Sequence, residues 1–139
     1  ADTLRWHLGN QGMAERCQIL VYRQDGLRGY AVVAREDATN IGLKRLKIVD
    51  LLIADDNLQV LDALLAKAYA VARADGCHVL EVIGLPAPLR ARVLHHRPLR
   101  RSMAAWPLYY KSCDDVLRLE LDREDAWYVT AYDGDTCLF

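Results

Sequence analysis

Basic and acidic side chains are segregated in the C-terminal third of this 139-residue sequence. Residues 114–139 contain eight acidic residues and two basic ones, whereas residues 82–113 contain no acidic residue and six basic ones: Arg90, Arg92, Arg97, Arg100, Arg101 and Lys111. Guanidinium groups bind phosphate oxygens through paired hydrogen bonds, so these arginines could receive a phosphorylated ligand or RNA. The more common alternative is a solvated helix face that pairs with the acidic segment. The net charge of -1 argues against a nucleic-acid partner.

Asp50 and two adjacent histidines are further candidates for chemistry. The pair His95 and His96 could include a general base, because histidine as a residue type suits that role, but neighbours in a helix point about 100° apart and cannot share one catalytic task. Asp50 lies in an apolar segment, where an ionised carboxylate needs a partner or a cavity. We expect it to pair with an Arg or Lys or to be exposed at a sheet edge, with a catalytic role as the alternative. No catalytic residue is assigned from these groups.

Metal, disulfide and membrane chemistry find no support in the residue pattern. The cysteines are scattered without a zinc-like spacing, which indicates reduced thiols in a cytoplasmic protein: Cys17, Cys77, Cys113 and Cys137. Asp133 and Asp135 resemble the start of a calcium loop, but no Glu completes it, so a turn is expected. No apolar run is long enough for a membrane helix, so no membrane partner is expected.

The hydrophobic pattern predicts the strands that must position these groups. Residues 17–22 and 28–34 are β-rich runs, and the Asp-Gly between them favours the turn of an antiparallel hairpin. Residues 46–54 are nearly continuously apolar, which predicts a central strand covered on both faces. Residues 78–83 predict a further strand.

A long helix is predicted over 57–75, where Leu and Ala recur at three- and four-residue spacing. Asp56 is expected to cap its first turn, with Gln59 as the capping-box partner, and Gly76 to end it in the left-handed conformation. The side chains expected to face the sheet are Leu61, Leu65 and Ala68. The strand–helix–strand unit then predicts parallel neighbouring strands with a right-handed crossover.

The C-terminal third is predicted to add a short helix and two strands. Pro88 suits the first position of a helix over 89–97 that Pro98 ends. Residues 103–111 and 126–132 predict the last strands, whose aromatic side chains are expected to pack in the core. The expected fold is therefore a single α/β domain over 1–139 with a mixed central sheet, formed by an antiparallel hairpin, a parallel strand–helix–strand unit and C-terminal strands.

This order of elements resembles the later part of the GNAT-type acyl-CoA N-acyltransferase fold. The residues that are similar to GNAT-like and FemAB-like bacterial proteins are Trp6, the segment Leu27, Arg28, Gly29, Tyr30, the segment Ile48, Val49, Asp50, and the residues from Trp127 to Asp135. The resemblance implies that the chain is a fragment of a longer protein, because the first strand of that fold and the two helices after it are missing.

The resemblance also implies a site for acetyl-CoA or another acyl-CoA. In that family the ligand lies between two splayed parallel strands, here 51–54 and 82–84, and its pyrophosphate sits on amides that open the long helix. The contacts implied at this helix start are Leu52, Ile53, Ala54, Asn57 and Leu58. The arginines implied to hold phosphates from the side are Arg90, Arg92, Arg100 and Arg101.

The sequence departs from the family pattern at two places. The phosphate-binding motif Q/R-x-x-G-x-G/A is replaced by a stretch without glycine from residue 43 to 75, and Asp55 and Asp56 stand in the phosphate's approach. The family's general-acid Tyr corresponds to Leu94, which has no proton to give. Two functions are therefore expected as alternatives: acyl transfer from acyl-CoA to an amine, or a catalytically degenerate domain that binds a partner, either an N-terminal GNAT-like half or a second copy.

Overall fold

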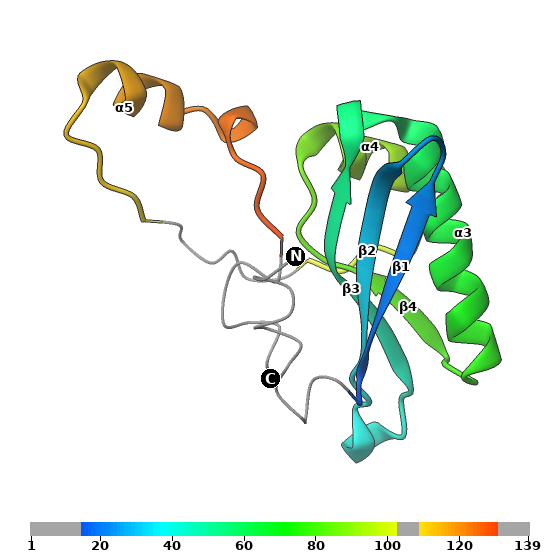
Figure 1. Ribbon diagram of the computed structural model, residues 1–139. Helices are drawn as coiled ribbons and strands as arrows, with labels where there is room; N and C mark the ends of the chain where they lie inside the picture. Colours follow the sequence, from blue (N-terminus) through cyan, green and yellow to red (C-terminus); the bar gives the residue numbers. More distant parts are fainter. Residues whose placement is uncertain (1–14, 103–108, 131–139) are drawn as a thin grey trace.

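A four-stranded sheet forms the centre of the structure, a computed structural model that describes residues 15–102 and 109–130 (Figure 1). The strands lie in the order β1-β2-β3-β4, and the first two pairs are antiparallel. The pair β3–β4 is parallel. The hairpin and the parallel strand–helix–strand unit predicted from the sequence are therefore confirmed. The bounds are β1 Cys17–Arg23, β2 Leu27–Arg35, β3 Arg45–Ile53 and β4 Val79–Val82.

The described helices differ in how closely they pack on this sheet. Helix α3 crosses one face of the sheet, and α4 adds Leu89 to the same apolar core. Helix α5, orange in Figure 1, lies away from the sheet. The bounds are α3 Leu58–Ala74, α4 Ala87–His95 and α5 Asp115–Leu121, with short 3₁₀ segments η1 Thr39–Ile41, η2 Ala54–Asp56 and η3 Glu124–Ala126.

The face of α3 that meets the sheet is rotated slightly from the predicted one. Leu61 and Ala68 are fully buried, as expected, but Leu65 is only partly buried. Leu64 is 2% exposed and fills the core position that the sequence pattern assigned to Leu65. Because each residue turns the helix by about 100°, adjacent leucines cannot both point at the sheet, and Leu65 packs at its flank.

The start of α3 corrects the predicted cap. Asn57, not Asp56, is the N-cap, and its Oδ1 accepts a hydrogen bond from the amide of Gln59 (2.9 Å). Asp55 and Asp56 instead form η2 with positive φ values of 56° and 48°, a conformation that favours glycine. The other end is as predicted, because Gly76 follows α3 with φ 64°.

A bulge in β3 places its side chains on both faces of the sheet. Val32 pairs with Asp50 and Val33 with Ile48, so Val49 is an extra residue without a partner in β2. An extra residue reverses the alternation of side chains, so the residues before and after it both face α3: Leu46, Ile48, Leu51 and Ile53. On the opposite face Val49 is buried, but Leu52 is 48% exposed, so this strand is covered less completely than predicted.

The C-terminal strands predicted over 103–111 and 126–132 are not formed by the described residues of these ranges. Residues 109–111 and 127–130 pair with no strand, and Ala126 ends η3. Between them lies α5, which the sequence analysis did not predict and which is capped by Asp114 accepting from the amides of Val116 and Leu117. Residues 103–108 and 131–132 of the predicted strands lie outside the described residues.

The burial of Leu64 predicts that alanine substitutions at three leucines of α3 lower the free energy of unfolding by different amounts. Leu64→Ala should lower the free energy of unfolding by about 2–5 kcal/mol, because it leaves a cavity against β2 and β3. Leu65→Ala should lower it less, and Leu58→Ala, at a position 41% exposed, should lower it by less than about 1 kcal/mol. Urea denaturation of the three variants measures these values. A larger loss for Leu65→Ala than for Leu64→Ala would contradict the packing.

The start of α3 gives a second prediction. Asn57→Ala removes the cap and should lower the free energy of unfolding by about 0.5–2 kcal/mol. The double change Asp55→Gly, Asp56→Gly should lower it by less than about 0.5 kcal/mol, because relief of left-handed strain offsets the greater entropy of the unfolded chain. Thermal and urea denaturation of both variants, measured against the unmodified chain, test this. If the aspartates formed the cap, the glycine variant would be the less stable of the two.

Candidate functional site

The parallel strands β3 and β4 separate halfway along β3. Their pairing begins at Arg45 and Val79 and stops at Ile48 and Val82. β3 continues for five more residues, whereas the chain after β4 runs through 83–86 into α4. We call the space between residues 49–53 and 83–85 the β3–β4 opening. It lies where the sequence resemblance implied splayed strands.

The start of α3 lies at the end of this opening. Leu52 and Ile53 end β3, Ala54 begins η2, and Asn57 and Leu58 start the helix. These five predicted contacts therefore follow one another along one edge of the opening. The amide of Leu58 has no acceptor among the described residues, whereas the amide of Gln59 is bonded to the Asn57 side chain. A helix start of this kind attracts anions.

Carboxylates change the electrostatics of this helix start. The side chains of Asp55 and Asp56 are exposed at the position where an anion would approach. Arg28 of β2 donates to Oδ2 of Asp55 (2.8 Å), which offsets one of the two charges. The ion pair is exposed to solvent and contributes little to stability. An anion here would therefore meet one partly neutralised carboxylate and a second one without a described ion pair.

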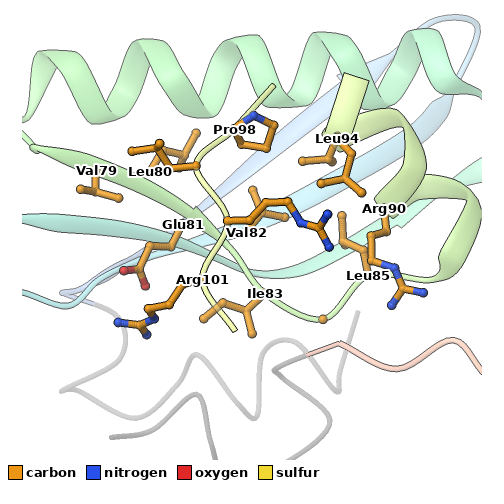
Figure 2. A pocket seen from close by; sticks show the side chains of 14 residues that line it. Val79, Leu80, Glu81, Val82, Ile83, Leu85, Arg90, Leu94, Pro98 and Arg101 are labelled. Carbon is orange, nitrogen blue, oxygen red and sulfur yellow. The ribbon is translucent and has the colours of Figure 1, made fainter. Parts of the chain in front are cut away.

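A pocket of about 440 Å³ lies along β4 and the chain that follows it (Figure 2). Its floor is apolar, with Leu80, Val82 and Ile83 among its residues. Arg90, Arg100 and Arg101 also line it, so the structure brings three of the four predicted phosphate ligands together. Figure 2 shows Arg90 and Arg101 at opposite ends, with Arg101 beside Glu81. Its volume is within the range of small-molecule sites.

Arg92, the fourth predicted phosphate ligand, is directed elsewhere. Its guanidinium donates two hydrogen bonds to Asp62 of α3, at 3.0 and 2.5 Å, and thereby ties α4 to α3. His96 Nε2 lies 3.2 Å from Oδ1 of the same carboxylate, the oxygen that also accepts from Arg92 Nε. The hydrogen bond from Arg92 is the main cause that lowers the pKa of Asp62 below its ordinary value, and the contact with His96 adds to it.

The acidic segment is partly paired with the basic one. Glu124 of η3 accepts from Arg90 (3.2 Å), but both side chains are largely exposed. The common alternative from the sequence, a basic helix face paired with acidic residues, thus holds for Arg90. Glu81 inside the pocket is paired with Arg45 instead, at 3.6 Å.

Asp50 is partly buried and has hydroxyl partners, whereas the sequence analysis expected an Arg or Lys partner or exposure at a sheet edge. Tyr30 Oη donates to Oδ2 of Asp50 (2.9 Å), and Thr130 Oγ1 donates to Oδ1 (3.2 Å). One residue further along β3, the Leu51 carbonyl accepts from the hydroxyl of Tyr128. The C-terminal segment therefore reaches β3 at the opening. The sequence pattern held no signal for this contact, because 77 residues separate Tyr128 from Leu51.

Among the cysteines of the described residues, Cys77 and Cys113 form no disulfide bond. No group of three or more His, Cys, Asp or Glu side chains in residues 15–102 and 109–130 could hold a metal ion. No helix of the same residues is long and apolar enough to cross a membrane.

The chain matches no protein-family model and no curated protein, but its fold matches solved structures. A transcriptional regulator from Bacillus halodurans C-125 is 14% identical, with 79% of this chain and 77% of that chain covered and a TM-score of 0.62. The ribosomal-protein-alanine N-acetyltransferase from Brucella melitensis biovar Abortus 2308 is 15% identical, with 78% and 80% covered and a TM-score of 0.60. The aminoglycoside N-acetyltransferase AAC(6')-Iy in complex with CoA is 14% identical, with 81% and 90% covered and a TM-score of 0.53.

These likenesses define the class of fold. The chain has the mixed α/β fold of GNAT-like acetyltransferases, as the sequence resemblance implied. Identities this low show the fold and not the activity. The likeness to FemAB-like proteins, the place of the chain within a longer protein and its cellular compartment stay predictions.

The ion pair between Arg92 of α4 and Asp62 of α3 predicts how stability depends on pH. The pKa of Asp62 is lowered in the folded chain, so its contribution to stability is complete above the unfolded pKa of about 3.9 and is lost as the pH falls through the folded value. Asp62→Asn should therefore be less stable than the unmodified chain at pH 6–7, and the difference should shrink below about pH 4. Urea denaturation over this pH range measures it. The control Asp115→Asn changes an exposed pair with Arg118 and should show no comparable pH-dependent difference.

Proposed function

We propose that this chain is a GNAT-like acyltransferase domain that transfers an acyl group from acetyl-CoA or another acyl-CoA to an amine. The single observation that carries the proposal is the separation of β3 from β4 after Ile48 and Val82, beside the start of α3. The fold shared with acetyltransferases supports it, and one of those structures contains CoA.

Two groups of residues would hold the ligand. Leu52, Ile53 and Ala54 run along the opening, and Asn57 and Leu58 present the helix start to a pyrophosphate. Arg90, Arg100 and Arg101 line the pocket along β4 and would bind phosphate oxygens from the side. Arg92 would contribute indirectly, because its guanidinium is engaged with Asp62 and fixes the position of α4.

The transfer needs few protein groups beyond correct placement. The amine nitrogen forms a bond to the thioester carbon, the carbon–sulfur bond breaks, the amine loses a proton and the leaving thiolate gains one. Leu94 cannot supply that proton. Within the described residues, the hydroxyl groups that contact residues 50 and 51 of the opening belong to Tyr30, Tyr128 and Thr130.

A second function is favoured by the aspartates at the start of α3. Asp55 and Asp56 place negative charge where a pyrophosphate would bind, and each carries a Cβ where close approach is needed. A domain that has lost acyl-CoA binding would act through its surface instead. The partner would be an N-terminal GNAT-like half or a second copy of the chain.

Calorimetric titration with acetyl-CoA and with CoA tests these proposals. The unmodified chain should bind with a dissociation constant no tighter than about 100 µM, or about -5.5 kcal/mol, because the aspartates oppose the pyrophosphate. Asp55→Gly, Asp56→Gly should bind more tightly, and the matched change Asp114→Gly, in the capped loop before α5, should not.

Three outcomes separate the alternatives. Weak binding that the glycine variant strengthens, and that added salt weakens, supports the acyl-CoA site. Low-micromolar binding that is insensitive to salt would show that the aspartates do not oppose the ligand. Absence of binding by both proteins at millimolar ligand would refute the acyltransferase proposal and favour the partner-binding domain.

A further inference from the structure

The C-terminal residues 127–130 lie across the part of β3 that β4 leaves unpaired. We call these four residues the strap. In Figure 1 the strap is the orange-red segment that returns from η3 toward β3. Its Tyr128 hydroxyl donates to the Leu51 carbonyl, which lies beyond the last β3–β4 pair at Ile48. A strap side chain thus uses a backbone acceptor at the edge of the opening.

A second contact fixes the strap to the same strand. Thr130 is 6% exposed, and its hydroxyl donates to the Asp50 carboxylate at 3.2 Å. The same carboxylate accepts from Tyr30 of β2 at 2.9 Å. A partly buried carboxylate favours such donors, because its charge is otherwise poorly solvated. Thr130 therefore stabilises Asp50 as well as the position of the strap.

The other end of the strap is anchored independently of β3. Trp127 Nε1 donates to the Leu121 carbonyl at the end of α5 (2.7 Å). Its ring lies against Tyr110, with 5.4 Å between ring centroids, and Tyr110 is in turn hydrogen-bonded to Asp122. Release of Tyr128 and Thr130 from β3 would leave this anchor intact, so the strap can leave the opening without the loss of α5.

We propose that the strap closes the β3–β4 opening and competes with the ligand for it, an inference that rests on the acyl-CoA function proposed above. Among the described residues, Tyr128 and Thr130 donate the hydrogen bonds to β3 that hold it closed. An extended ligand that reaches along residues 49–53 would meet the Tyr128 side chain at Leu51. Entry of the ligand requires the strap to move. The apparent dissociation constant is therefore the intrinsic one divided by the fraction of molecules in which the strap is open.

The competition is tested by removing one hydroxyl at a time from the full chain. Tyr128→Phe removes the hydrogen bond to Leu51 and keeps the ring, and Thr130→Val removes the hydrogen bond to Asp50 and keeps the volume. The matched controls are Tyr109→Phe and Thr39→Val, at exposed positions that have no described side-chain partner. Each protein is studied by amide hydrogen exchange and by calorimetric titration with acetyl-CoA.

The two readouts give distinct expectations. The amides of residues 49–53 should exchange about fivefold faster in Tyr128→Phe, the effect of one neutral hydrogen bond, while the amides of Leu61 and Leu64 stay unchanged. The dissociation constant for acetyl-CoA should fall by about the same factor, and further in the double variant. Both control variants should behave as the unmodified chain.

Unchanged amide exchange at residues 49–53 in both single variants would refute the proposal that the strap covers this part of β3. Equal or weaker acetyl-CoA binding by variants that exchange faster there would overturn the competition while the acyl-CoA site stands. Faster exchange with no acetyl-CoA binding by any of the proteins would keep the strap as a cover of β3 and refute the acyl-CoA function.

Discussion

The extra residue at Val49 sets the geometry on which the rest of the structure depends. A bulge bends its strand and increases the local twist, and in β3 it falls directly after the last pair with β4. The side chains on both sides of it still face α3, so the helix packs on an unbroken apolar surface. The strand beyond it leaves β4 and carries its backbone to the start of α3. Core packing and the β3–β4 opening thus come from one inserted residue.

Gly29 shows how closely the start of α3 is held against this strand. A Cβ at this position would lie 2.8 Å from Val60 Cγ1, closer than real Cβ atoms approach, and 3.0 Å from the Leu52 carbonyl oxygen, which is also a tight contact. The helix start, the end of β3 and the beginning of β2 are therefore in direct contact. This contact also brings Arg28 next to Asp55. The local charge at the candidate phosphate site is therefore set by Arg28 of β2 and by Asp55 and Asp56 of η2.

The fold and the candidate site differ in how well they agree with an acyltransferase. The mixed α/β fold agrees with that of the matched structures, because a fold depends on apolar packing that many sequences satisfy. Binding of a pyrophosphate depends on a few backbone amides and charges. Asp55 and Asp56 adopt a backbone conformation typical of glycine, but each adds a carboxylate where glycine would have no side chain. The fold therefore agrees with the acetyltransferase structures, whereas the charges at the start of α3 oppose the pyrophosphate of the proposed ligand.

The hairpin, the central strand, α3 and the parallel strand–helix–strand unit could be predicted from the sequence, because they depend on local periodicity, on turn residues and on short connections. The sequence also grouped Arg90, Arg92, Arg100 and Arg101, and all of these except Arg92 line one pocket in the structure. It did not determine whether Leu64 or Leu65 is buried, since a rotation of α3 by a fraction of a turn decides between them. The tertiary structure alone decided that Arg92 binds Asp62 and that 127–130 contact β3 through side chains rather than as a strand. Contacts between residues 30 to 80 positions apart depend on how the elements pack, and no local pattern records that packing.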